Sequence, residues 1–352
     1  MLSLSSIRRK RVLWRRGGRF LSAAWLAAAL ASPASATSYG WPIRPFDRQH
    51  RVRGNFGDPR TLRGSIDAHG NNPLSFHSGI DIQAPDGTPV YAIEPGEVRR
   101  TSPTAIAVGT PWATASAPLV FGYWHIDPVV ADLQYVGFHQ LIGYVHPGAG
   151  HVHLSERRFG RYVNPLRSGG ITPYSDFQRP VIRSITVYRA STQREMQQDA
   201  VSGRVDIVVD AYDPPSIPLW SPWTGAVLSP EHVSWGGLFG GTWIPTSFHP
   251  LTVDFTGLPS LPVPDVYAPG TRQNGPNAPG DYRFWLVRNL DTGVLSPGPH
   301  TIWATASDTR GNSATMTFRL TVVDVPAPAG GPALARLREA QVDLGRGWIR
   351  PA

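Results

Sequence analysis

The stretch FHSGIDIQAPDGTPVYAIEPGEV, residues 76–98, is the clearest structural signal in the sequence. Two strand-like runs flank its Gly-Thr-Pro-Val turn, and similar short strands continue to residue 166 and again from 180 to 325. Gly (36) and Pro (35) are frequent, which favours turns over long helices. This pattern predicts an all-β chain, in which an antiparallel β-sheet core is followed by an immunoglobulin-like β-sandwich.

The expected domains follow the turn-rich breaks between these groups of strands. We expect a signal peptide at 1–36, a lead-in segment at 37–60, the sheet domain at 61–167, a linker at 168–179, the β-sandwich at 180–325 and a flexible tail at 326–352. The last strands of the sandwich are predicted to form a β-hairpin that turns between Asp308 and Asn312.

The first 36 residues have the pattern of a secretory signal peptide. A basic segment leads into an apolar run at 20–31, and Ala34-Ser35-Ala36 matches the small-x-small pattern that signal peptidase cleaves. The apolar run is too short for a membrane-spanning helix, which needs about 20 residues. We therefore expect an exported mature chain from about Thr37, located in the periplasm, the cell wall or the medium, with no transmembrane segment. An uncleaved membrane anchor is the alternative.

Removal of the signal peptide changes the charge of the chain. It takes away seven basic residues and no acids, so the formal net charge falls from +8 to +1. Binding to nucleic acid needs a persistent basic patch, so we expect no nucleic-acid partner for the mature chain. The chain has no cysteine, so a metal site would use His, Asp and Glu ligands.

The histidines are unevenly distributed, and six of the eleven lie between residues 77 and 153. Side chains at i, i+2 and i+4 of a strand share one face, so His77 and Asp81 would project together, as would His151 and His153. If the two strands are neighbours, they offer three metal ligands and one spare histidine. Three protein ligands with one open position are typical of catalytic zinc. Scattered polar residues on a β-rich surface are the simpler alternative.

Several segments in a fixed order extend this pattern over residues 50–167. His77-x-Gly-x-Asp81 is followed by Gly-Thr-Pro-Val, and HVHLSE (151–156) carries a His-x-His and a glutamate. The segments that stand before, between and after them are GNFGDPR (54–60), FGYWHID (121–127), LIGYVH (141–146) and YVNPL (162–166). Together these segments resemble the lysostaphin/LytM-type zinc metallopeptidases over about a third of the chain.

The resemblance implies a compact antiparallel β core with a narrow groove over a zinc ion. It assigns His77, Asp81 and His153 as zinc ligands. It also assigns His151 as the general base and His125 as the residue that stabilises the oxyanion. The implied substrates are peptide bonds in the cross-bridges or stems of bacterial cell-wall peptidoglycan. We therefore expect a secreted zinc metalloendopeptidase that acts on peptidoglycan peptides.

Three departures from the family pattern concern the walls of the groove. The loop HPGAGHVH (146–153) is short and lacks the common proline before the first histidine. Glu156 stands one residue further from the His-x-His than the family glutamate. Residues 101–127 depart from the usual strand–hairpin pattern, which leaves His139 and His146 as alternatives to His125. The metal ligands are unaffected, whereas the choice of substrate depends on these walls.

The second domain carries no catalytic constellation in its sequence. Asp210, Asp213 and Asp308 lie near strand ends, where such domains can hold calcium, although solvated turn aspartates are the favoured interpretation. Five tryptophans are expected mainly in the core, and a sugar-stacking surface is the alternative. They are Trp220, Trp223, Trp235, Trp243 and Trp285. We interpret the domain as a spacer or as a binding module for a wall or surface polymer.

Two other functions are compatible with the sequence. A catalytically silent relative would bind peptidoglycan or activate another wall hydrolase, and a third option is a zinc peptidase of other secreted proteins. Silent members of the family typically lack a metal ligand. This chain keeps His77, Asp81, His151 and His153, which favours the enzyme.

Overall fold

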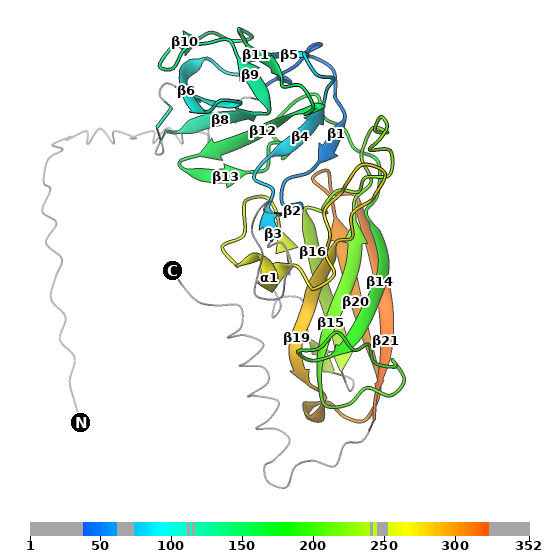
Figure 1. Cartoon of the computed structure of the whole chain (residues 1–352). Coiled ribbons are helices and arrows are strands. Elements are labelled where there is room, and N and C mark those ends of the chain that lie inside the picture. Colours follow the sequence, from blue (N-terminus) through cyan, green and yellow to red (C-terminus); the bar gives the residue numbers. More distant parts are fainter. Residues whose placement is uncertain are drawn as a thin grey trace, which may run out of the picture. The chain divides into compact units, whose positions relative to one another are not determined.

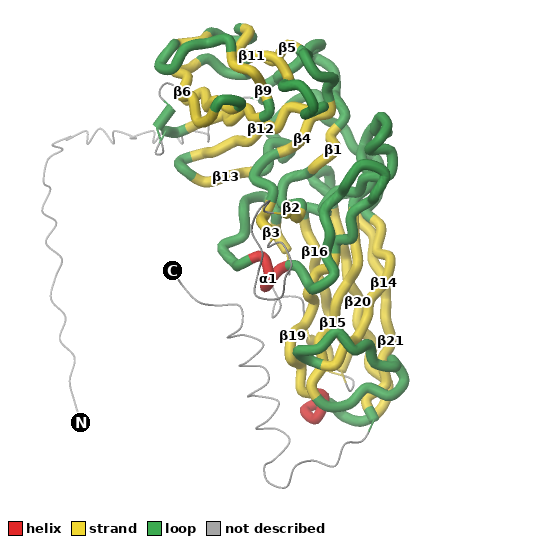
Figure 2. Tube along the Cα trace, viewed as in Figure 1, coloured by secondary structure: helices red, strands yellow, loops and turns green. Residues whose placement is uncertain are grey.

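The computed structural model describes residues 38–61, 74–110, 113–114, 117–239, 242–244 and 253–323. The predicted signal peptide and the predicted flexible tail lie outside these residues. The described chain consists of short strands and two helical turns, α1 (Val263–Val266) and η2 (Thr292–Val294), and its neighbouring strands pair antiparallel (Figure 1, Figure 2). The prediction of an all-β, antiparallel fold is confirmed. A membrane-spanning helix is not found in this part of the chain.

Among the described residues, an eight-stranded antiparallel sheet forms the larger part of the N-terminal domain (Figure 1). Its strands lie in the order β1 (Val52–Gly54), β4 (Ile80–Gln83), β12 (His151–Arg158), β8 (Leu119–Trp124), β7 (Ala105–Thr110), β6 (Gly96–Ser102) and β10 (Tyr135–Val136), and β13 (Arg161–Val163) pairs with β12. A three-stranded sheet contains β5 (Pro89–Tyr91), β11 (Leu141–Val145) and β9 (Ile126–Pro128). A two-stranded sheet contains β2 (Pro59–Thr61) and β3 (Leu74–Phe76).

The register of the central strands explains which side chains meet. β12 lies between β4 and β8, and His153 pairs with Asp81 on one side and with Trp124 on the other. Alternate residues of β4 and β12 are apolar and are fully buried in the hydrophobic core of the domain. They are Ile80, Ile82, Val152 and Leu154. The intervening polar residues therefore share the opposite face of the sheet.

The C-terminal domain contains two antiparallel sheets that share one hydrophobic core (Figure 1). One sheet contains β14 (Val181–Arg189), β15 (Arg204–Tyr212) and β19 (Arg283–Asp291). The other contains β17 (Thr242–Ile244), β16 (His232–Phe239), β20 (Gly298–Ser307) and β21 (Ser313–Val322), with β18 (Val253–Asp254) paired to β16. Ile207 and Val209 of the first sheet belong to the same buried cluster as Ile302 and Ala304 of the second. These sheets form a β-sandwich, and its immunoglobulin-like topology stays a prediction.

The lead-in segment supplies core residues to both domains. Trp41 and Ile43 are buried in the hydrophobic cluster of the N-terminal domain, whereas Phe56 is fully buried in the cluster of the sandwich. Next to Phe56, Gly57 has a φ of +87°, and a Cβ there would lie 2.4 Å from the ring of Phe255. A glycine is required at this close approach because it combines a positive φ with the absence of a side chain. The domain boundaries themselves stay predictions.

Candidate active site

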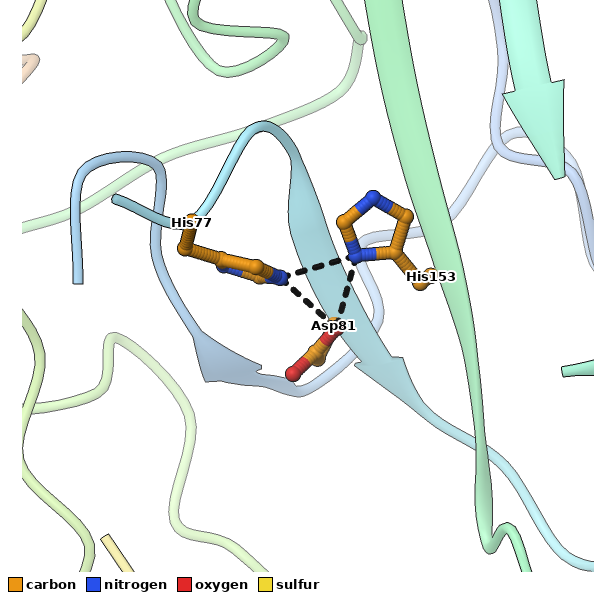
Figure 3. Close-up of side chains that lie close together, drawn as sticks. All are labelled: His77, Asp81 and His153. Carbon is orange, nitrogen blue, oxygen red and sulfur yellow. Dashed lines mark hydrogen bonds and ion pairs between the residues drawn. The ribbon is translucent and has the colours of Figure 1, made fainter. Parts of the chain in front are cut away.

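Three side chains of the N-terminal domain converge on one point, and we call them the candidate metal site (Figure 3). His77 directly follows β3, Asp81 lies on β4 and His153 lies on β12. His77 Nε2 is 3.0 Å from Asp81 Oδ1 and 2.8 Å from His153 Nδ1, and the latter two atoms are 3.1 Å apart. Ligands about 2.1 Å from a tetrahedral metal lie about 3.4 Å from one another. The three atoms therefore have nearly the spacing of a zinc site.

His77 and Asp81 are held in the protonation states that metal binding requires. His77 Nδ1 lies 2.7 Å from the Asn55 carbonyl, which can only accept a hydrogen bond, and 3.1 Å from Arg60 Nη2, which can only donate one. The shorter contact favours the tautomer in which Nδ1 carries the proton and Nε2 keeps its lone pair. Burial and the nearby charge of Arg60 lower the pKa of His77 to about 3. Burial raises the pKa of Asp81, but two neighbouring histidines and Arg60 together hold it well below its usual range. A neutral imidazole and an ionised carboxylate are the forms that bind a metal.

His153 completes the candidate metal site and has one nitrogen without a protein partner. Its Nδ1 faces Asp81 and His77, whereas its Nε2 is buried and has no hydrogen-bond partner in the described structure. Gly79 makes room for the ring, because a Cβ at this position would lie 2.8 Å from His153 Nε2. The site thus offers two imidazole nitrogens and one carboxylate oxygen, and this donor set fits zinc.

His151 lies beside the candidate metal site, and its Nε2 faces the carboxylate of Asp81. His151 Nδ1 lies 2.7 Å from the Ala149 carbonyl, which can only accept a hydrogen bond, and 2.6 Å from Arg53 Nη2, which can only donate one. His151 Nε2 is 3.5 Å from Asp81 Oδ1. The Arg53 guanidinium lies against the same edge of the ring. Burial, assisted by the charge of Arg53, lowers the pKa of His151 to about 4. The ring is therefore neutral near neutral pH, and Nε2 can accept a proton in the tautomer in which Nδ1 donates to the Ala149 carbonyl.

His125 reaches the same place from the turn between β8 and β9. Its φ is +63°, in the left-handed region, and its ring centroid is 4.5 Å from that of His151. Burial lowers the pKa of His125, although part of the residue remains open to solvent. The two alternatives make other contacts, because His139 stacks on a phenylalanine and His146 pairs with Asp127 at 2.7 Å. The structure places His125, and neither alternative, against the ring of His151.

Residues 75–165 match the model of one known protein family, Peptidase family M23. They form an M23 peptidase domain. This domain contains the candidate metal site together with His151 and His125, and the family assignment supports peptidase activity. No match to the chain is found among curated proteins.

Solved structures that are similar to part of the chain include the following three. Csd3 of Helicobacter pylori is 18% identical, with 37% of this chain and 34% of that chain covered and a TM-score of 0.28. A zinc containing peptidase from Vibrio cholerae is 22% identical, with 36% and 39% covered and a TM-score of 0.28. The M23 metalloprotease pseudoalterin, from the deep sea, is 17% identical, with 39% and 79% covered and a TM-score of 0.27. The chain thus matches well under half of the length of the first two structures.

Two arginines beside the candidate metal site have no role in the sequence-based predictions. Arg60 Nη2 donates to Asp81 Oδ2 at 3.0 Å, and Arg60 Nη1 donates to Asp58 Oδ2 at 3.3 Å. Arg53 lies on β1, and its Nη2 is 2.6 Å from His151 Nδ1. Arg60 lies in the run GNFGDPR, which resembles the opening motif of the family, so this motif could have indicated that Arg60 lies near the site. No local pattern identifies Arg53, because its place depends on the pairing of β1 with β4.

The sandwich contributes two tryptophans to the surroundings of the M23 domain, through the loop between β15 and β16. The Arg53 guanidinium lies 4.2 Å from the ring centroid of Trp223, and that of Arg51 lies 4.3 Å from the ring centroid of Trp220. Gln83 of β4 exchanges two hydrogen bonds with the backbone of Trp220, at 2.9 and 3.2 Å. Cation–π contacts of this kind contribute about 0.5–2 kcal/mol each. The loop therefore packs against residues that contact the candidate active site.

The tryptophans of the sandwich divide into two groups. Trp235 and Trp285 are buried, as expected for core residues. Trp220 is 46% exposed, and Trp223 is partly buried against Arg53. The side chain of Trp243 lies outside the described residues. A continuous stacking surface is not formed by the four that are described, because two of them belong to the core.

Glu156 supports β12 from within the domain. It is fully buried and accepts hydrogen bonds from Arg158 and Arg167, each at 2.6 Å, and from the Tyr39 hydroxyl. These contacts connect β12 to the segment that follows β13 and to the lead-in segment. Glu156 therefore serves the packing of the M23 domain and lies outside the candidate metal site.

Proposed function

We propose that the chain is an exported zinc metalloendopeptidase that hydrolyses peptide bonds in bacterial peptidoglycan. The convergence of three candidate ligand atoms next to Nε2 of His151 is the observation that carries this proposal. The M23 assignment of residues 75–165 supports it. Export is supported by the pattern of the first 36 residues, and the peptidoglycan substrate is supported by the family resemblance.

The candidate metal site would hold zinc through His77 Nε2, Asp81 Oδ1 and His153 Nδ1. Bound zinc would supply a Lewis acid that lowers the pKa of a water to about 7 and polarises the carbonyl of the scissile peptide. Arg60 fixes the second oxygen of Asp81, and the Asn55 carbonyl fixes the proton of His77. Outer contacts of this kind typically change metal affinity by about 10–100-fold.

His151 is the proposed general base. Its Nε2 accepts a proton from the attacking water, while Nδ1 stays bonded to the Ala149 carbonyl and holds the ring in place. The carboxylate of Asp81 lies 3.5 Å away and stabilises the imidazolium that forms. The same nitrogen then passes the proton to the leaving amine, which restores His151 for the next turnover.

His125 is the proposed donor to the oxyanion. Its lowered pKa favours the neutral ring, which can donate one N–H to the developing negative charge. The ring lies beside His151 and keeps access to solvent, so a peptide at the site can meet both histidines. The sandwich is proposed to bind a wall or surface polymer, and its loop with Trp223 would form part of the surface that a substrate meets.

The test uses the mature chain, residues 37–352, loaded with zinc and incubated with purified sacculi in the presence or absence of a zinc chelator. Mass spectrometry of the soluble fraction identifies the released fragments. We expect chelator-sensitive release of cut peptides, and the fragment masses identify the bond. Binding to sacculi without release, by folded and zinc-loaded protein, would make the chain a peptidoglycan-binding protein and refute the proposal. Cleavage of other secreted proteins without any cleavage of sacculi would refute the assignment of peptidoglycan as the substrate.

A further inference from the structure

Three buried aspartates meet where the linker joins the sandwich. Asp176 lies in the linker, Asp213 directly follows β15 and Asp308 directly follows β20. Their exposed fractions are 5%, 2% and 4%, and one carboxylate oxygen of each lies within 4.8 Å of the other two. The interpretation of Asp213 and Asp308 as solvated turn residues is therefore wrong. Asp210 lies outside this group and pairs with Arg183 at 3.5 Å.

Two of the three carboxylates are oriented by neighbouring donors. Asp308 Oδ1 accepts the backbone N–H groups of Arg310 and Asn312 at 2.8 and 2.9 Å. Asp176 Oδ1 accepts a backbone N–H at 2.9 Å, and Asp176 Oδ2 accepts the Tyr174 hydroxyl at 3.2 Å. These donors fix the carboxylates in place, but each is neutral. These hydrogen bonds therefore do not neutralise the carboxylates.

Asp213 has no such support. Its Oδ1 is buried and has no hydrogen-bond partner. Among the described residues, no arginine or histidine forms an ion pair within 4.0 Å with any of the three aspartates. The guanidinium of Arg310 is close enough for its charge to oppose the rise in the pKa of Asp176, but its hydrogen bonds go to the carbonyls of Tyr174 and Thr309 at 3.1 and 3.2 Å. The group is therefore a cluster of buried acids in which one oxygen, Asp213 Oδ1, has no hydrogen-bond partner.

The electrostatics of the group favour the uptake of positive charge, either as a proton or as a cation. Burial and the charges of Asp176 and Asp308 raise the pKa of Asp213 to about 9. Buried charges are tolerated when they are paired or when they coordinate a metal. A proton on Asp213 neutralises one of three charges. A divalent cation neutralises two and also provides the partner that Asp213 Oδ1 lacks.

We propose that Asp176, Asp213 and Asp308 bind a calcium ion. Calcium accepts oxygen ligands at about 2.3–2.6 Å in flexible geometries, so oxygens on opposite sides of the ion stand about 5 Å apart. The spacing of the three carboxylates, within 4.8 Å, agrees with this. All three donors are oxygens, whereas zinc favours nitrogen and sulfur. Magnesium demands near-ideal octahedral geometry and keeps several waters, which a group this buried does not favour.

The ion would join three segments that are far apart in the chain. β15 and β20 belong to different sheets of the sandwich, and Asp176 belongs to the linker that leads into it. The unfolded chain does not hold these carboxylates together, so calcium binds the folded state and stabilises it. The site uses none of the residues of the proposed zinc chemistry, and its test is independent of that proposal.

The test uses the zinc-loaded mature chain, freed of calcium and titrated with calcium chloride in a calorimeter and in thermal unfolding. We expect one calcium ion per chain and a Tm that rises with calcium. Asp213→Asn preserves the shape of the side chain and removes its charge. This variant should lose the calcium-dependent rise and should melt above the wild type in calcium-free buffer. Asp210→Asn is the matched control, three residues away and outside the group, and should keep the calcium response.

Two further measurements keep the proposal testable if the Asp213 variant does not fold. Terbium, a luminescent substitute for calcium that is excited through nearby aromatic rings such as Tyr174, should bind the wild type and be displaced by calcium. His153→Ala should keep the calcium response, because it alters only the candidate metal site. Absence of calcium binding by the wild type, an equal rise in Tm with magnesium, or an undiminished response in Asp213→Asn would each overturn the proposal.

Discussion

His151→Ala and His153→Ala form a matched pair that separates catalysis from metal binding. The two residues lie on the same face of β12, two positions apart, and are 7% and 5% exposed. Each change therefore removes an imidazole of the same size from an almost equally buried position. His151→Ala should keep its zinc, because all three candidate ligand atoms remain. Its rate should fall by about 10²–10⁴, the usual contribution of a general acid–base group, which raises the barrier by about 3–5 kcal/mol.

His153→Ala, in contrast, should lose zinc and activity together. The two readouts are zinc content of the purified protein and kcat/KM on a cell-wall peptide, with thermal unfolding to show that both variants fold. A His151→Ala protein that loses zinc as completely as His153→Ala would show that His151 is a ligand. A His151→Ala protein with full zinc and a rate near that of the wild type would show that another group is the base. Either result would refute the assignment.

Three other changes test separate parts of the structure. Arg60→Met removes a donor to Asp81 and should weaken zinc binding by about 10–100-fold in a competition with a chelating dye. Gly57→Ala would place a Cβ 2.4 Å from an aromatic ring of the sandwich at a position with positive φ, and should destabilise the protein by about 2–5 kcal/mol in urea unfolding. Gly87→Ala is the control: position 87 has a φ of +76° but open space for a Cβ, so this variant should show only the smaller backbone effect. In the folded protein the pKa of Asp213 is raised to about 9, so near neutral pH the folded state holds a proton that the unfolded state releases. In calcium-free buffer the Tm should therefore fall as the pH rises from the ordinary carboxyl range towards 9. Saturating calcium should remove most of this fall, and a Tm that is independent of pH would contradict the charge argument.

The fold class and the ligand-bearing strands follow from local patterns. Short alternating runs and frequent turns are sufficient to predict an all-β chain, and the alternation in HVHL directs two histidines to one face of β12. The pairing of His153 with Asp81 cannot be predicted in this way, because it requires β12 to lie beside β4, a strand that is distant in the sequence. Local pattern does not specify that order. The ordered motifs of a known family supplied it instead.

Charged residues outside those motifs were harder to predict. Asp213 and Asp308 follow strands in turn-like sequence, where aspartate is common because its side chain bonds to nearby backbone N–H groups. Their burial arises when the ends of two different sheets meet, which is a property of the tertiary fold. Arg53 and Trp223 come together for the same kind of reason, since they lie 170 positions apart and in different domains. Short-range reasoning has no access to such pairs.

Phe56 limits how the protein can be divided or recombined. Its ring is buried among sandwich residues, and the Tyr267 hydroxyl donates to the carbonyl of the adjacent Gly57 at 2.9 Å. Four positions after Phe56, Arg60 donates to Asp81 of the candidate metal site. A catalytic fragment cut at the linker would expose this ring, whose burial contributes about 1.5–3 kcal/mol, and would loosen the segment that orients a proposed zinc ligand. Gene shuffling that attached the N-terminal domain to another partner would meet the same obstacle. We therefore expect the two domains to be inherited together.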